Sequence, residues 1–291
     1  MTTDYGLPTI DFSKMIVYLN GEYLPREQAR ISPEDRGFLF ADAVYEVARF
    51  WRGRPFHLPG HLERMGEGLA ALRIEADASF YTTVAQRLLE VNDLTDKDAI
   101  VYAQVSRGSA LRAHAFPPPG TRPTIYAFAR ETDPLPSSDG GRAILAADER
   151  WGRCDIKTVM LLANVMALQK AKEAGAIEAL LVRDGLVWEA TKANLFLVRD
   201  GVVRTAPKGP RILPGITRGA AIAAASRLGL SVEERAFTVD EMLGAEEVFL
   251  ASTTLWTYPL VEIDGKAIGN GRPGLVAPML KKALWEEFTR Q

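Results

Sequence analysis

The sequence contains little cysteine and histidine and carries almost no net charge. Cys154 is the only cysteine among the 291 residues, so an internal disulfide is excluded and a reducing compartment is expected. The three histidines, His57, His61 and His114, do not have the spacing of metal ligands. Lys and Arg total 35 against 37 Asp and Glu, without a basic run. Nucleic acid and anionic membrane surfaces are therefore not expected as partners.

Long apolar runs, targeting signals and nucleotide motifs are also missing. No apolar stretch reaches the roughly 18 residues of a membrane helix, and residues 1–5 form neither the basic nor the apolar part of a signal peptide. We find no nucleophile elbow and no glycine-rich phosphate loop. What remains is an ordinary composition, 47% hydrophobic and 25% charged, which predicts a cytoplasmic globular protein with small-molecule partners.

Periodicity predicts a mixed α/β chain that begins with a hairpin. Asn20-Gly21 between two short apolar runs is a strong signal for a two-residue turn. Residues 43–50 alternate, with Tyr45 and Val47 on one face, so this strand is expected to see a core on one side and a cavity on the other. The other elements expected in the first half are helices over 61–73, behind a Pro59-Gly60 break, and 81–91, and strands over 99–107 and 124–130.

A polar segment rich in Pro and Gly, residues 131–141, separates the two halves of the chain. We therefore place an interdomain linker at 134–141, between a smaller N-terminal α/β domain (1–133) and a larger C-terminal domain (142–291). The elements expected in the second domain are strands over 143–147, 179–182, 186–187, 194–198, 202–203 and 248–251, and helices over 161–174, from about 215 to 228, and over 275–288.

Lys157 occupies an unusual place for a lysine. It follows the apolar Ile156 and precedes the apolar run 159–163. An amine that is partly shielded from water is more often neutral and nucleophilic, as a lysine must be to hold an aldehyde cofactor as a Schiff base. Glu189 follows three apolar residues, and it can supply a carboxylate to the side of an aromatic cofactor ring that lies opposite the aldehyde. Two alternatives stay open at this point, a surface lysine at a helix start and a solvated glutamate in a hairpin.

Two further segments offer groups that bind phosphate. Gly215-Ile216-Thr217 opens a predicted helix after Pro214, and the first turn of a helix presents free N–H groups to an anion. Ser252-Thr253-Thr254 adds hydroxyls, and Arg64 on the predicted helix 61–73 adds a cation. A simple N-cap role for Thr217 and a solvated Arg64 are the alternatives.

The loop after the predicted strand 99–107 carries Arg112 and His114, two residues apart. In an extended loop both side chains point the same way. Such a pair can bind a carboxylate, with the guanidinium making a bidentate contact and the imidazole a further hydrogen bond. An ordinary polar surface loop is the alternative.

In their order along the chain these segments resemble the pyridoxal-phosphate transaminases of fold type IV, and most closely the D-amino acid transaminases. The resemblance extends from Arg36 to Gly265. It is carried by Arg36-Gly37-Phe38, residues 42–47, Cys154-Asp155-Ile156-Lys157, residues 189–194, Leu213-Pro214-Gly215-Ile216-Thr217-Arg218 and Ser252-Thr253-Thr254.

The resemblance implies a role for each candidate residue. Lys157 would hold pyridoxal 5'-phosphate as a Schiff base and move the proton at the substrate Cα, and Glu189 would bind the proton of the pyridinium nitrogen. The phosphate would be bound by Arg64, Ile216, Thr217 and Thr253. The substrate α-carboxylate would be bound by Tyr45, Arg112 and His114, the last two acting across the interface of a homodimer.

That interpretation predicts transamination between D-alanine or D-glutamate type donors and 2-oxoglutarate or pyruvate. A branched-chain L-amino acid or R-selective amine transaminase of the same fold is the alternative within the group, and an aminodeoxychorismate lyase is disfavoured by the Arg-x-His pair. A protein that stores or senses the cofactor, or one that binds none, is the alternative outside it. Ala190 and Lys192 stand where the close relatives carry Gly and Ser, and Trp256 is expected to narrow the pocket.

Overall fold

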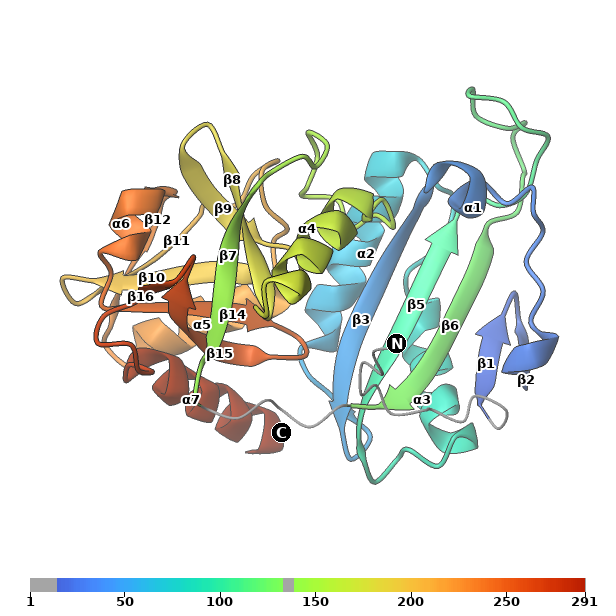
Figure 1. Cartoon of the computed structure of the whole chain (residues 1–291). Coiled ribbons are helices and arrows are strands. Elements are labelled where there is room, and N and C mark those ends of the chain that lie inside the picture. The colour runs from blue at the N-terminus through green and yellow to red at the C-terminus, as the bar shows by residue number, and fades with distance from the viewer. Residues whose placement is uncertain (1–14, 133–138, 291) are drawn as a thin grey trace, which may run out of the picture.

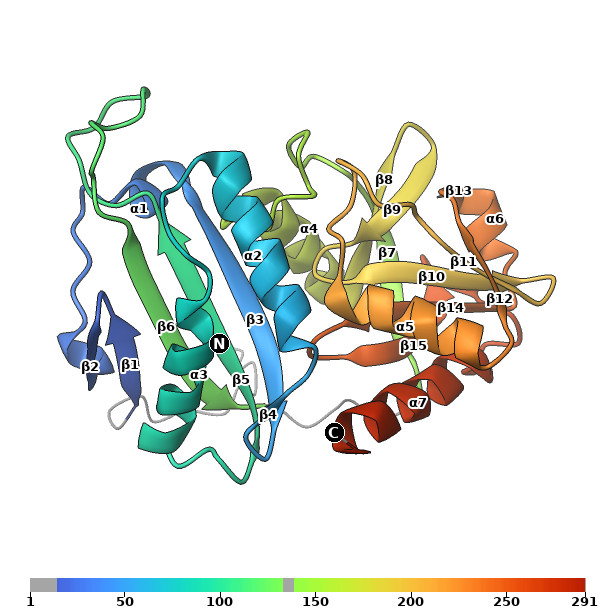
Figure 2. The same cartoon turned by 180° about the vertical axis from the view of Figure 1, so that it is seen from behind.

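A computed structural model describes residues 15–132 and 139–290, and its first sheet has six antiparallel strands in the order β2-β1-β6-β5-β3-β4. The strands are β1 (Ile16–Leu19), β2 (Glu22–Pro25), β3 (Ala43–Trp51), β4 (Arg54–Pro55), β5 (Asp98–Ser106) and β6 (Thr124–Glu131). The helices of this half are α1 (Arg36–Phe40), α2 (Leu58–Leu72) and α3 (Phe80–Val91). Figure 2 shows α2 and α3 lying over one face of the sheet.

Alternation along β3 gives its two faces different neighbours. Val44 and Ala48 are buried in one hydrophobic cluster with Met65 and Leu69 of α2. Tyr45, on the opposite face, is only half-buried. The prediction of one core face and one cavity face is therefore confirmed.

The predicted start of the helix over 61–73 was wrong by three residues. α2 begins at Leu58 and includes Pro59 and Gly60 in its first turn, where a proline is tolerated because its missing N–H would have no helical partner. The hairpin at Asn20-Gly21 is confirmed, since both residues have positive φ angles, 51° and 103°, as such a turn requires.

The second sheet has ten strands in the order β12-β11-β10-β14-β15-β7-β8-β9-β13, with β16 paired to β15. They are β7 (Gly141–Ala147), β8 (Glu178–Arg183), β9 (Leu186–Ala190), β10 (Asn194–Arg199), β11 (Val202–Thr205), β12 (Ser231–Glu234), β13 (Phe237–Thr238), β14 (Glu247–Ser252), β15 (Trp256–Ile263) and β16 (Lys266–Ala267). Its helices are α4 (Leu162–Glu173), α5 (Ile216–Arg227), α6 (Val239–Leu243) and α7 (Val276–Arg290). None of the helices in the described ranges is long and apolar enough to cross a membrane.

The predicted linker lies between these two sheets along the sequence. Residues 134–138 of it are outside the described part of the chain, and its last residue, Gly141, is the first residue of β7. The division into two domains stays a prediction.

The crossover from β7 to β8 brings the two sheets together. These neighbouring strands are parallel, so the chain must return across the sheet, and it does so through residues 148–161 and α4. On the way it runs beside β3: the Tyr45 amide donates to the Lys157 carbonyl, and the Val159 amide donates to the Ala43 carbonyl. Figure 1 shows α4 at the junction of the two sheets. Lys157 therefore lies where the sheets meet.

Candidate active site

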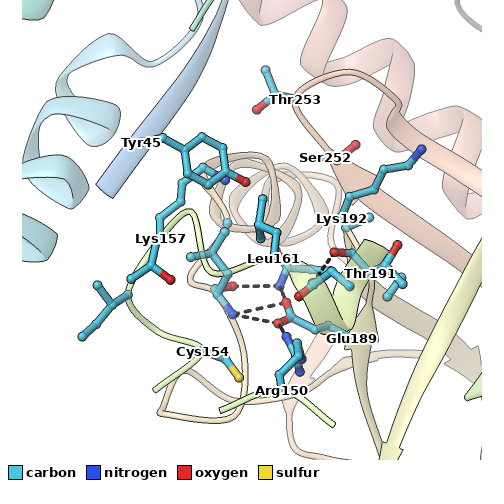
Figure 3. A pocket seen from close by; sticks show the side chains of 18 of the residues that line it. Tyr45, Arg150, Cys154, Lys157, Leu161, Glu189, Thr191, Lys192, Ser252 and Thr253 are labelled. Carbon is cyan, nitrogen blue, oxygen red and sulfur yellow. Dashed lines mark hydrogen bonds and ion pairs between the residues drawn. The ribbon is translucent and has the colours of Figure 1, made fainter. Parts of the chain in front are cut away.

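A pocket of about 290 Å³ lies at this junction. Its walls come from β3, α2, the crossover, the turn between β9 and β10, the start of α5 and the segment after β14. Of the residues predicted from sequence, it is lined by Tyr45, Arg64, Lys157, Glu189, Ile216, Thr217 and Thr253. Figure 3 shows the part of this set around Lys157 and Glu189.

The amine of Lys157 points into the pocket against an aromatic ring. Its Nζ lies 4.3 Å from the ring centroid of Tyr45, and Tyr45 stacks on Tyr102 with centroids 5.5 Å apart. The side chain is half-buried, and α4 begins only at Leu162, five residues later. The alternative of a surface lysine at a helix start is therefore wrong.

Glu189 is buried on β9 and surrounded by donors. Its carboxylate accepts hydrogen bonds from the Arg150 guanidinium, the Asn194 side-chain amide (3.0 Å) and the Leu213 backbone amide (3.1 Å). Burial raises the pKa of Glu189 to about 7, and the charge of Arg150 opposes that rise. The alternative of a solvated hairpin residue is therefore wrong.

Arg150 was not singled out from the sequence, yet it is the main partner of Glu189. It also makes bonds of 2.8 Å and 3.0 Å to the two Asp148 oxygens and one of 3.1 Å to the Arg211 carbonyl. Burial alone would raise the pKa of Asp148, but Arg150 holds it below its usual range. Arg150 and Glu189 are 39 positions apart, so no local pattern marks the pair.

The part of the pocket wall around the start of α5 carries groups that can bind an anion. Thr217 is buried at the second position of α5, and Gly215 is the N-cap residue, so the N-cap alternative for Thr217 is wrong. Arg64 reaches the same wall from α2 and donates to the Pro214 carbonyl at 3.0 Å. Ser252 and Thr253 line the pocket, whereas Thr254 is exposed outside it. Helix N–H groups, a guanidinium and hydroxyls together suit a phosphate.

Glu46 fixes Arg64 in that position. It accepts bonds of 2.6 Å and 2.8 Å from Arg64 and lies 2.7 Å from the Nδ1 of His61. Burial would raise the pKa of Glu46, but Arg64 and His61 outweigh it and lower this pKa to about 2. The alternative of a solvated Arg64 is wrong, because it is 7% exposed. An acidic residue on the core face of a strand was the one sequence signal that pointed to this pair.

The three predicted carboxylate-binding residues do not meet within one chain. Tyr45 lines the pocket, but Arg112 and His114 are exposed on the loop between β5 and β6. Both pack on Phe40, with the Arg112 Cζ 5.3 Å and the His114 ring 5.7 Å from its ring centroid. Figures 1 and 2 show this loop projecting beyond the end of the first sheet.

The three residues that depart from the resemblance lie in different places relative to the pocket. Ala190 is buried against the pocket, and Lys192 lines it with an exposed side chain. Trp256 is 2% exposed and packs on Phe56 and Phe288, with ring centroids 4.9 Å and 5.5 Å away. The expectation that Trp256 narrows the pocket is therefore wrong, because its side chain fills the core under α7.

Comparisons with known proteins agree with this geometry. The sequence model of the family described as amino-transferase class IV matches residues 43–263. A D-alanine aminotransferase of Bacillus licheniformis is 41% identical over 93% of this chain and 96% of its own length, and one of Staphylococcus haemolyticus is 35% identical over 92% and 96%. A branched-chain amino acid aminotransferase of T.th., solved with pyridoxamine 5'-phosphate, superposes with a TM-score of 0.85 at 27% identity over 95% of each chain.

Proposed function

The chain belongs to the class IV aminotransferases, and we propose that it transfers amino groups between D-amino acids and 2-oxo acids with pyridoxal 5'-phosphate as its cofactor. This membership confirms the resemblance to fold type IV transaminases. The proposal rests above all on the convergence of Lys157, Glu189 and the start of α5 in one pocket. Donors of the D-alanine or D-glutamate type and acceptors such as pyruvate or 2-oxoglutarate are the proposed substrates.

The groups that line the pocket match the three polar parts of this cofactor. Lys157 presents an amine to the aldehyde, Glu189 a carboxylate to the ring nitrogen, and Arg64 with the start of α5 a phosphate site. When bound, pyridoxal 5'-phosphate supplies an electron sink for the bonding electrons at the substrate Cα.

Side chains of the protein, Lys157 and Glu189 above all, would handle the protons of the reaction. With the cofactor bound, the Lys157 amine would act as the base that takes the proton from the substrate Cα and as the acid that delivers it to the cofactor carbon derived from the aldehyde. When the Glu189 carboxyl is ionised, it can accept a hydrogen bond from the N–H of the cofactor ring. The positive charge of Arg150 favours that ionised form. Leu161 and Tyr45 line the pocket beside Lys157, and their apolar surfaces would reduce the contact of the amine with water.

The subunit arrangement we propose is a homodimer in which each copy completes the other's site. Arg112 and His114 lie outside the pocket of their own chain, so a second copy must bring them to Tyr45 if the three are to bind one α-carboxylate. Apolar side chains suited to such an interface are exposed on α1, on the loop after β5 and on α4: Phe38, Leu111, Phe116, Leu162 and Met166. We place the dimer in the cytoplasm, in keeping with the single buried Cys154.

A branched-chain L-amino acid transaminase is the second candidate, because the protein solved with pyridoxamine 5'-phosphate is named for that substrate. Its identity to this chain, 27%, is lower than the 41% of the D-alanine aminotransferase. Arg112 and His114 also favour the D-amino acid assignment, since the resemblance to the D-amino acid transaminases gives these two residues, with Tyr45, the role of binding the substrate α-carboxylate.

The test is the spectrum of the purified holoenzyme mixed with D-alanine or L-leucine. D-alanine is expected to convert the cofactor absorbance within one turnover, and turnover of L-leucine alone would refute the proposal. Absorbance that no amino acid changes would indicate a cofactor-storing protein. Lys157→Ala is expected to lose about 10³-fold or more in rate, whereas Lys208→Ala, at an exposed lysine outside the pocket, serves as the matched control.

A further inference from the structure

The turn that carries Lys192 is held rigidly at the edge of the pocket. The Ala190 amide donates to the Ala193 carbonyl at 2.8 Å. The Thr191 hydroxyl donates to the buried Glu178 carboxylate, and the Asn164 side-chain amide donates to the Thr191 carbonyl at 2.6 Å. With its neighbours fixed on both sides, the Lys192 backbone has a defined position, and only its exposed side chain is free to adapt.

Among the described cations that line the pocket, Lys192 differs from Arg64 and Arg150 because it is not paired with an acidic side chain. Arg64 is paired with Glu46, and Arg150 with Asp148 and Glu189. Lys157 serves the cofactor. Within the described part of the chain, Lys192 makes no hydrogen bond and no ion pair of its own. A lysine in this state at a pocket wall is available to an anionic group of a ligand.

We propose that Lys192 binds the second carboxylate of dicarboxylic substrates, such as 2-oxoglutarate and D-glutamate. The inference rests on the proposed function and adds the substrate class that this pocket prefers. The α-carboxylate is assigned to Tyr45 with the partner copy's loop, and the reacting carbon lies at Lys157. The substituent on that carbon must therefore extend toward another wall.

The position of Lys192 fits that requirement. Figure 3 shows its side chain extending away from Lys157 and Tyr45, on the side of the pocket where Ser252 is drawn. An ammonium at the pocket edge keeps part of its hydration, so its pairing with a carboxylate is of the strength of an exposed pair and not of a buried one. Such a contact discriminates between substrates without immobilising them.

Glu178 is the acidic group that Lys192 influences inside the protein. Burial raises the pKa of Glu178, and the Lys192 charge opposes this rise. One Glu178 oxygen, Oε1, accepts from the Thr191 hydroxyl and from the backbone amides of Ala179 and Thr191. The other, Oε2, is buried without a hydrogen-bond partner, but Glu178 does not line the pocket, and no hydrogen bond or ion pair joins it to Lys192 in the described part of the chain. Lys192 therefore keeps its donors for a ligand.

The test compares glutarate with butyrate, two unreactive acids that differ by one carboxylate. Their binding to the holoenzyme is measured by calorimetry for the native chain, Lys192→Met, Lys192→Arg and, as a control, Lys208→Met, an exposed lysine outside the pocket. In Lys192→Met the preference for glutarate over butyrate is expected to fall about fivefold, the scale of an exposed charge pair. Lys192→Arg is expected to retain it. In Lys192→Met the KM for the dicarboxylic acceptor, relative to the KM for pyruvate, is expected to rise by the same factor.

Three results would overturn the proposal: an unchanged preference, equal weakening of both acids, or weaker binding of pyridoxal 5'-phosphate itself, which would assign the ammonium to the cofactor. The proposed function fails separately. If the native holoenzyme converts no D-amino acid, the reaction is wrong, while the comparison of glutarate with butyrate still decides what Lys192 binds.

Discussion

The backbone amide of Tyr45 donates a hydrogen bond to the carbonyl oxygen of Lys157, with the two atoms 3.0 Å apart. The side chains of the same two residues meet again inside the pocket, where the Lys157 amine lies over the Tyr45 ring. Strand β3 thus fixes both the main chain and the side chain of the lysine. Tyr45, a residue of the first sheet, therefore orients the Lys157 amine, which lies on the crossover between two strands of the second sheet.

Arg150→Met is expected to shift the pH dependence of catalysis upward. Arg150 opposes the effect of burial on Glu189, so its removal raises the pKa of Glu189 above about 7. At neutral pH the carboxyl is then mostly protonated and no longer accepts the ring N–H. We expect the catalytic rate at pH 7 to fall about tenfold or more, because each unit by which the pKa rises lowers the ionised fraction about tenfold. The rate should recover in part at higher pH.

The pH–rate profile of the half-reaction with D-alanine measures this shift. Arg153→Met is the control, since Arg153 is half-exposed and, among the described residues, its ion pair is with Asp155, at 2.8 Å. A profile that falls in height without moving along the pH axis would contradict the role assigned to Arg150.

Gly215→Ala is expected to weaken cofactor binding through Asn194. A Cβ at Gly215 would lie 2.0 Å from the Asn194 Oδ1, so the amide must move, and it then leaves the Glu189 carboxylate and the Leu213 carbonyl. We expect a rise of about tenfold in the Kd for pyridoxal 5'-phosphate, the scale of a lost hydrogen bond to a charged group.

Gly219→Ala, within α5 itself, provides the matched comparison. Its added Cβ meets nothing within 4 Å, and alanine in a helix interior is favoured over glycine by roughly 0.5–1 kcal/mol. This variant should gain stability and keep its cofactor affinity. Equal affinities for the two variants would show that the contact with Asn194 has no role.

Stability is expected to fall in acid because of Glu46 and His61. The pKa of Glu46 is lowered to about 2 in the folded state, so the unfolded state binds more protons between about 4.5 and 2, and stability is lost as the pH falls through that window. Burial lowers the pKa of His61, which gives a loss of the same sign beginning near pH 6.5.

Urea unfolding midpoints between pH 7 and pH 3 measure this loss. Glu46→Gln is expected to be less stable at pH 7, because it leaves Arg64 without a buried partner, and to show a weaker decline below pH 4.5. Glu67→Gln, exposed on the same helix as Arg64, should follow the native curve. A native decline that Glu46→Gln leaves unchanged would assign the acid sensitivity to other groups.

Charges on the apolar face of α4 are expected to separate the proposed dimer. Leu162 and Met166 are 74% and 53% exposed and lie one turn apart on the helix, so Leu162→Glu with Met166→Glu places two carboxylates on one face. Light scattering should report a monomer that has lost most of its activity. Leu275→Glu, at an 85% exposed position outside these elements, should remain dimeric, and an active monomer would show that no partner residue enters the site.

The elements that carry the chemistry could be predicted because their signals are local. The apolar run after Lys157, the Pro-Gly sequence before α5 and the Asn-Gly hairpin turn each act over a few residues, and the structure has the elements in those places. The partners of the key groups could not be predicted in the same way. Strand pairing and helix packing bring Arg150 to Glu189 and Arg64 to Glu46. Of these contacts, only the position of the acidic Glu46 on the core face of β3 is a sign that the sequence itself contains.

The wrong expectation about Trp256 has a similar cause. Its position just after the Ser-Thr-Thr segment suggested the pocket, but the backbone adopts a φ of 58° at Trp256 and its indole enters the cluster with Phe56 and Phe288. Proximity in sequence to a pocket residue does not determine which way a side chain points. Arg112 and His114 illustrate the converse, since their proposed role depends on a second chain that one sequence does not describe.

The walls of the pocket come from both sheets, with Tyr45 and Arg64 in the first half of the chain and Glu189 and Thr217 in the second. A ligand that contacts both halves is released when either one unfolds, so its binding free energy opposes the unfolding of each. Without the cofactor, the two halves remain joined by the hydrogen bonds of the crossover and by the packing of Phe56 on Trp256 and Phe288. Cofactor loading is therefore expected to raise the temperature of one shared thermal transition, and two separate melting steps in the cofactor-free protein would contradict this coupling.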